Sequence, residues 1–112
     1  MSYTLTVRHG PRVRREGYEA LDDALVALKR HVDEVRAEGP LDSVQAFREY
    51  EASRRVAARL QLSSGGWLRG REAGIDVMGD GTLVPYAGAI RRRQLEADAG
   101  QSPFAVVGEA LR

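Results

Sequence analysis

One segment of the chain repeats its apolar positions with the period of an amphipathic helix. Between residue 21 and about residue 37, large apolar residues recur at steps of three and four, which places them on one stripe of a helix. The stripe consists of Leu21, Leu25, Leu28, Val32 and Val35, with Ala24 beside it. Gly39 and Pro40 end the helix, because glycine adopts the left-handed cap and proline cannot continue. The pattern predicts one main helix over about 21–37 that needs an apolar surface to lie on.

Other segments alternate apolar and polar residues with a period of two, as half-buried strands do. Residues 3–8 alternate in this way, and residues 56–62 give the cleanest alternation in the chain. Between them, residues 12–17 follow a turn signal and predict a short return strand with Val13 pointing inward. Four charged residues lie in that piece, so we expect an edge or solvated strand there.

The second half of the chain predicts a hairpin and a short final helix. Residues 63–74 contain four glycines and are expected to form a loop, whereas 75–86 carry an Asp-Gly turn between two apolar runs. Residues 89–95 are expected to resume as a strand. Ser102 and Pro103 have the residue types of a helix N-cap and first turn, and Phe104, Val107 and Leu111 form the apolar stripe that follows.

These elements predict an α+β fold. We expect a mostly antiparallel sheet of five or six strands, with the main helix across one face and a short C-terminal helix. Residues 1–96 are expected to form one domain, and residues 97–112 a linker and a helix that packs on the same domain. Residues 41–53 fit either a strand or a helix, and the pattern leaves both interpretations open.

Composition restricts the function classes. A chain of 112 residues is long enough to bury a core, and the lack of cysteine excludes disulfides, thiolate metal sites and thiol nucleophiles. The first residues lack the features of a signal peptide, and no apolar run approaches the roughly 20 residues of a membrane span. We therefore expect a cytoplasmic protein that does not act at a membrane.

Charge is balanced overall but uneven along the chain. The net charge of +1 gives no general attraction to nucleic acid. Sixteen of the seventeen basic residues are arginine, which fits either carboxylate and phosphate recognition or the codon usage of a GC-rich genome. Residues 54–71 carry five arginines and no acid, and three more follow at 91–93, so the predicted strands are basic while the predicted helix is acidic. If the helix covers one sheet face, the other face is expected to carry the arginines.

The arginines and the single tryptophan form the candidate partner-binding set. Its members are Arg55, Arg59, Trp67, Arg69, Arg71, Arg91, Arg92 and Arg93. Trp67 fits three interpretations, namely a cap on the core, an anchor for a protein partner and a stacking platform for a nucleic-acid base. The arginine triplet is also typical of a solvated edge strand that charge protects from aggregation.

Catalytic and metal-binding patterns are missing from the sequence. His9 and His31 have no second histidine or carboxylate at metal-ligand spacing, so we interpret both as surface residues. Asp76 and Asp80 are better explained by a hairpin than by a calcium loop or an acid–base pair. No residue is predicted to be catalytic, and no cofactor, metal or small-molecule substrate is expected.

One short segment resembles a known family. Residues 16–25, Glu-Gly-Tyr-Glu-Ala-Leu-Asp-Asp-Ala-Leu, are similar to the strand-to-helix step of the HicB-type antitoxin domain. The resemblance implies a helix on an antiparallel sheet, in a domain that neutralises an RNA-cleaving toxin. It covers about ten of the 112 residues. The family's three strands before the helix and its separate DNA-binding helix-turn-helix do not fit this sequence, so no functional residue is transferred.

The sequence therefore predicts a small non-catalytic interaction module. Its partner is expected to be a protein or a second copy of the chain, with homodimerisation as one form. The contact surfaces are expected to be exposed strand edges and the arginine-bearing sheet face. The alternative is weak binding of RNA or single-stranded DNA through that face and the Trp67 loop.

Overall fold

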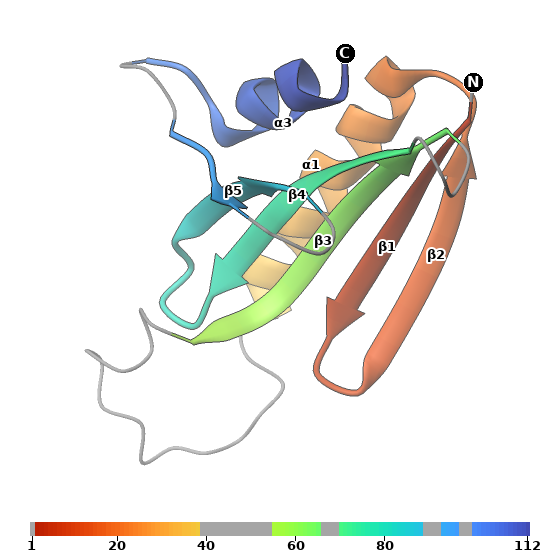
Figure 1. Ribbon diagram of the computed structural model, residues 1–112. Helices are drawn as coiled ribbons and strands as arrows, with labels where there is room; N and C mark the ends of the chain where they lie inside the picture. Colours follow the sequence, from red (N-terminus) through yellow and green to blue (C-terminus); the bar gives the residue numbers. More distant parts are fainter. Residues whose placement is uncertain (1, 39–54, 66–69, 89–92, 97–99) are drawn as a thin grey trace.

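A computed structural model of the chain describes residues 2–38, 55–65, 70–88, 93–96 and 100–112. Within these ranges the fold is α+β, as predicted, with six strands in one antiparallel sheet of order β2-β1-β3-β4-β5-β6 (Figure 1). The elements are β1 (Tyr3–His9), β2 (Arg12–Tyr18), α1 (Leu21–Glu38), β3 (Val56–Ser64), β4 (Arg71–Met78), β5 (Leu83–Ala87), β6 (Arg93–Gln94) and α3 (Pro103–Leu111). The predictions for residues 41–53 and for Trp67 lie outside the described residues.

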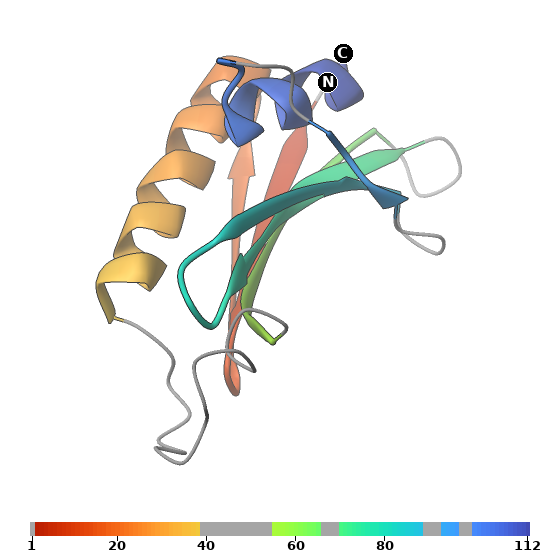
Figure 2. The same ribbon diagram turned by 90° about the vertical axis from the view of Figure 1, so that its left-hand side faces the viewer.

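Both described helices lie on the same side of the sheet, with α1 along the strands and α3 near the end of β4 and β5 (Figure 2). The core fills the space between these layers. Its fully buried side chains are Leu5, Leu60, Leu62 and Ile75 from the sheet and Leu28, Val32 and Val107 from the helices. The predicted stripe of α1 therefore supplies the apolar surface that faces the sheet. No helix among the described residues is long and apolar enough to cross a bilayer.

Helix α1 begins where the sequence pattern places it. The amide of Ala24 donates to the carbonyl of Ala20 at 3.1 Å, so Ala20 occupies the N-cap position. Asp22 and Asp23 lie in the first turn, where their charges favour the positive end of the helix dipole. Val26 points away from the sheet and is 70% exposed, which marks the solvent side of the helix.

Strand β2 is the edge strand that its charges predicted, but the prediction that Val13 points inward is wrong. Gly10, with φ 60, and Pro11 form a two-residue turn that pairs His9 with Arg12. This register places Val13 opposite Arg8, on the sheet face away from α1, where Val13 is 46% exposed. The turn sets the register and so determines which residues of β2 face the helix, and this register leaves Val13 on the solvent side.

The predicted loop over 63–74 is wrong at both ends. Ser63 and Ser64 end β3, while Arg71 to Gly74 begin β4. Glycine and serine are typical of loops, but here they extend a long antiparallel pair in which Gln61 lies opposite Gly74. Only residues 65 and 70 of the described chain remain between the strands, and residues 66–69 lie outside the described part.

The remaining elements follow local signals. The β4–β5 hairpin closes through Gly81, with φ 89, and the carboxylate of Asp80 accepts from the amide of Thr82 at 2.9 Å. Of the strand expected over 89–95, Arg93 and Gln94 form β6, and residues 89–92 lie outside the described part. Ser102 caps α3 by accepting from the amide of Ala105 at 3.1 Å, as its position before proline predicted.

Candidate functional site

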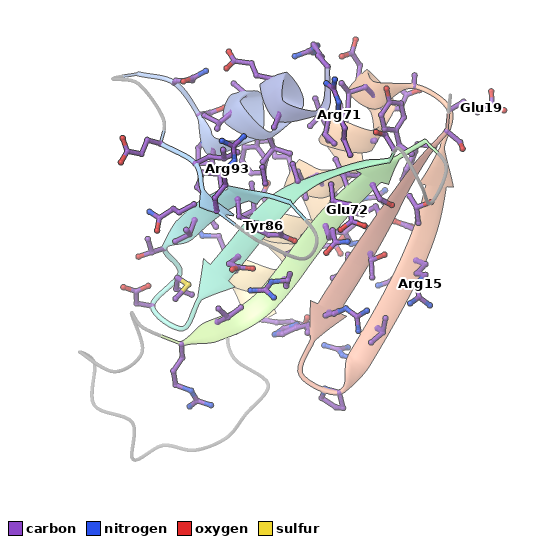
Figure 3. All side chains as sticks on the ribbon, in the orientation of Figure 1. Arg15, Glu19, Arg71, Glu72, Tyr86 and Arg93 are labelled. Carbon is purple, nitrogen blue, oxygen red and sulfur yellow. The ribbon has the colours of Figure 1, made fainter. Side chains whose placement is uncertain are left out.

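The sheet face turned away from α1 and α3 carries mostly polar side chains, and we call it the open face. The strand registers determine its members. They are Thr4, Thr6 and Arg8 of β1, Val13, Arg15 and Gly17 of β2, Arg59, Gln61 and Ser63 of β3, Glu72, Gly74 and Asp76 of β4, and Val84 and Tyr86 of β5. Figure 3 shows Arg15 and Tyr86 on this face, on β2 and β5 respectively.

Arg59 is neutralised within the open face by Asp76. The two residues lie directly opposite each other on β3 and β4. The Arg59 guanidinium donates to both carboxylate oxygens of Asp76, from Nε at 2.6 Å and from Nη2 at 2.9 Å. These hydrogen bonds raise the pKa of Arg59 above its usual value. This bidentate pair balances the positive charge of Arg59 with the negative charge of Asp76.

Tyr86 connects this ion pair to the neighbouring strands. Its ring centroid lies 5.4 Å from the Arg59 guanidinium carbon, within cation–π range, and its hydroxyl donates to Gln61 Oε1 at 3.4 Å. Gln61 in turn donates to Glu72 at 2.9 Å. Tyr86 is 3% exposed although it lies on the open face, because its ring extends across Gly74, the residue opposite it on β4.

Gly74 is required for this close approach. A methyl group at position 74 would clash with the backbone carbonyl oxygen of Leu60 and would lie 2.8 Å from the Tyr86 hydroxyl. The absence of a side chain at Gly74 leaves room for the tyrosine, as in other sheets where an aromatic ring covers a cross-strand glycine. On β3, β4 and β5 the polar side chains of the open face therefore bond mainly to one another, and these bonds connect the three strands.

The other half of the open face ends in a strand edge with unmatched positive charge. Arg8 and Arg15 are exposed on the open face, and Arg14 is exposed on the opposite side of β2. Within the described part of the chain, none of these three guanidiniums forms an ion pair or a hydrogen bond, whereas Arg12 donates to Glu38 at 2.8 Å. We call Arg14 and Arg15 of β2, together with the adjacent Arg8 of β1, the cationic edge.

The arginines predicted from the sequence do not form one surface. Arg55 is exposed just before β3, and Arg59 lies in the network. Arg71 and Arg93 are on the helix-bearing side, because their partners across the sheet are Ser64 and Ala87 (Figure 3). Arg71 also donates to the carbonyl of Arg112, at the end of α3. The expectation that the strand arginines share the open face is therefore wrong for Arg71 and Arg93. Trp67, Arg69, Arg91 and Arg92 lie outside the described residues.

The cationic edge is the part of the site that the sequence interpretation missed. The alternation of β1 already placed Arg8 with Thr4 and Thr6 on the polar side. Recognising Arg14 and Arg15 required the register of the β1–β2 hairpin, which the two-residue turn sets and which the misplaced Val13 obscured. The dense arginine runs of the sequence lie elsewhere, at residues 54–71 and 91–93.

The interpretation of His9 and His31 as surface residues is wrong. Each imidazole is only 4% exposed, between α1 and the β1–β2 hairpin. His31 Nε2 lies 2.5 Å from Glu16 Oε1 of β2, and its Nδ1 lies 3.3 Å from Glu34 Oε2 of α1. Both ring nitrogens of His31 therefore face a carboxylate, and Arg30 Nη2 also lies 3.4 Å from Nε2. Sequence spacing gave no sign of the contact, since Glu16 precedes His31 by fifteen positions.

These ion pairs connect α1 to β2 along the helix. The hydrogen bond with His31 lowers the pKa of Glu16, and the hydrogen bond from Arg12 lowers the pKa of Glu38. His9 Nδ1 of β1 lies 3.5 Å from Glu38 Oε2, so the same end of α1 is also connected to β1. The hollow beside both histidines has a volume of about 40 Å³, enough for water but not for a substrate. The cluster is therefore suited to connecting α1 to the β1–β2 hairpin rather than to binding a substrate.

The described residues contain no group of three or more histidine, aspartate or glutamate side chains placed to hold a metal ion. Comparison of the chain with family models, with curated proteins and with solved structures gave no match.

Proposed function

We propose that this chain is a small, non-catalytic interaction module that binds an extended segment of a partner protein along β2. The observation that carries the proposal is the position of β2 at the end of the strand order, with β1 on its inner side and no described strand on its outer side. Seven residues form this edge, and most of them are exposed. Addition of a strand to such an edge is a common way to bind an extended peptide.

The hairpin geometry identifies the backbone groups that are free to pair. A two-residue turn is flanked by a hydrogen-bonded pair, which here is His9 and Arg12. Bonding then alternates along an antiparallel strand, so Arg14 and Glu16 direct their backbone groups toward β1. The amides and carbonyls of Val13, Arg15 and Gly17 point outward, where an added strand would meet them.

Charge favours a different protein over a second copy of the chain. Two β2 strands placed side by side would bring the arginines of one copy next to those of the other, against one glutamate from each. Like charges that face each other across a strand pair are destabilising. We therefore expect a monomer, which light scattering over a concentration series would test; a dimer that forms through β2 would overturn this choice of partner.

Display selection of random heptapeptides on the immobilised protein tests the proposed function. Arg15→Pro removes an outward amide but no bond to β1, so we expect it to weaken the selected peptides by about tenfold or more while the protein stays folded. Arg15→Lys keeps both the amide and the charge and serves as the control. If no peptide is selected, or if the selected peptides bind Arg15→Pro as tightly as the parent protein, binding along β2 is wrong.

Nucleic-acid binding is the second candidate, and the cationic edge favours it. Guanidiniums that have no partner among the residues the structure describes are suited to phosphate as well as to carboxylate. Phosphate-driven binding weakens steeply as salt rises. Polarisation of a labelled single-stranded RNA tests this candidate at about 50 mM salt, where such binding is strong. No binding under that condition would eliminate it.

A further inference from the structure

The free edge of β2 carries positive charge on both of its sides. On the open face the edge presents Val13 and Arg15, and on the helix-bearing side it presents Arg12 and Arg14. Arg12 is matched by Glu38, but Arg14 and Arg15 have no ion-pair partner in the described part of the chain. Two neighbouring residues of one edge strand thus offer unmatched guanidiniums, one on each face.

An added strand would meet these guanidiniums in a fixed order. Every described strand pair of the sheet is antiparallel, so we take the added strand as antiparallel to β2. Side chains directly opposite each other in such a pair lie close enough to interact, with Cβ atoms about 4.5–5.5 Å apart. The partner residues opposite Arg15, Arg14 and Val13 are then consecutive and follow in that order along the partner.

We infer that β2 takes an acidic extended segment, in which two consecutive acidic residues lie opposite Arg15 and Arg14 and an apolar residue follows opposite Val13. This inference rests on the proposed addition of a strand at β2. Val13 offers an exposed aliphatic side chain on this edge, and it lies next to Arg15 on the same face. The position opposite Glu16 is not acidic, because that carboxylate already faces His31 and would repel a second one.

The arginines also keep β2 from pairing with itself. Positive charge along an exposed edge is a known protection against edge-to-edge association of identical strands. The same charge attracts a strand of opposite sign, so one set of side chains provides both selectivity and protection. An acidic segment is attracted to these arginines, whereas the β2 strand of a second copy, with three arginines and one glutamate, is repelled by them.

Three labelled heptapeptides test the inference by fluorescence anisotropy. The probe is Thr-Thr-Glu-Glu-Val-Thr-Thr, and its matched controls carry Gln-Gln or Lys-Lys in place of Glu-Glu. At about 50 mM salt, where surface charges are weakly screened, we expect the Glu-Glu peptide to bind about tenfold more tightly than the Gln-Gln peptide. The Lys-Lys peptide is expected not to bind.

Variants of the protein that lack selected positive charges test whether the preference for the Glu-Glu peptide depends on Arg14 and Arg15. Arg14→Gln with Arg15→Gln should abolish the preference for Glu-Glu over Gln-Gln. Lys29→Gln with Arg36→Gln removes the same net charge from exposed positions on α1 and should leave the preference unchanged. Thermal melting of each variant confirms that it is folded. A preference that survives in the Arg14 and Arg15 variant, or that is lost in the α1 variant, would overturn the inference.

The peptide results separate this inference from the proposed function. Equal binding of the Glu-Glu and Gln-Gln peptides, with both lost in Arg15→Pro, would leave strand addition standing and overturn the acidic preference. Binding of the Glu-Glu peptide that Arg15→Pro does not weaken would overturn strand addition itself. A single-stranded RNA that displaces the Glu-Glu peptide at lower concentration than the unlabelled peptide does would show a nucleic-acid site, and the inference would be wrong.

Discussion

Replacing Gly74 by alanine places a methyl group where the sheet has no room for one. The added carbon would clash with the backbone carbonyl oxygen of Leu60 and would lie 2.8 Å from the hydroxyl of Tyr86. A side chain can rotate away, but the carbonyl belongs to a paired strand and moves only if β3 and β4 separate locally. Overpacking of a well-packed site costs about 1–3 kcal/mol, and we expect Gly74→Ala to reach the upper end, about 3 kcal/mol.

Equilibrium denaturation by urea measures this loss, and Gly17→Ala is the matched control in the same sheet. Gly17 lies on the edge strand with nothing within 4 Å of an added methyl group. Because alanine restricts the unfolded chain more than glycine does, this control should stabilise the protein by about 0.4–1 kcal/mol. If Gly74→Ala also leaves the free energy of unfolding unchanged or raises it, the close packing of β3, β4 and Tyr86 is wrong.

Three further predictions concern α1 and its contact with β2. Leu28→Ala, at a fully buried site, should cost about 2–5 kcal/mol in urea unfolding, and a loss well below about 1 kcal/mol would mean that this face is solvated. Ala20→Ser should stabilise the fold by about 0.5–2 kcal/mol, and an unchanged or lowered melting temperature would contradict its N-cap position. The pKa of Glu16 is lowered from 4.5 by its hydrogen bond with His31, so its contribution to stability is present above about pH 4.5 and is lost as the pH falls through the lower folded pKa. Glu16→Gln should therefore flatten the acid side of a melting-temperature profile, and an identical profile would contradict the ion pair.

The elements that could be predicted from the sequence are those whose signals are local. The period of α1 and the cap at Ser102 each depend on residues within a few positions of one another. The alternation of β3 works in the same way, since the face that a strand buries must be apolar. The Asp-Gly turn before β5 is equally local, because its conformation requires a positive φ at Gly81.

The features that could not be predicted depend on residues far apart in the chain. Asp76 neutralises Arg59 from seventeen positions away, and only the β3–β4 register brings them together. His31 is buried because Glu16 of another element faces it, not because of its neighbours on α1. Glycine is typical of loops, but Gly74 lies in a strand. It is needed there because Tyr86 and the Leu60 carbonyl leave no room for a side chain. In each case the environment of the residue depends on tertiary packing, which the residue type alone does not predict.

Hydrogen exchange of the β2 amides tests most directly the claim that this strand is a paired but open edge. The alternation set by the two-residue turn predicts slow exchange at Arg14 and Glu16, which bond to β1, and much faster exchange at Val13, Arg15 and Gly17. Uniformly slow exchange along the strand would mean that the outer edge is already covered. Uniformly fast exchange would mean that β2 is not part of the sheet, and either result would contradict the account.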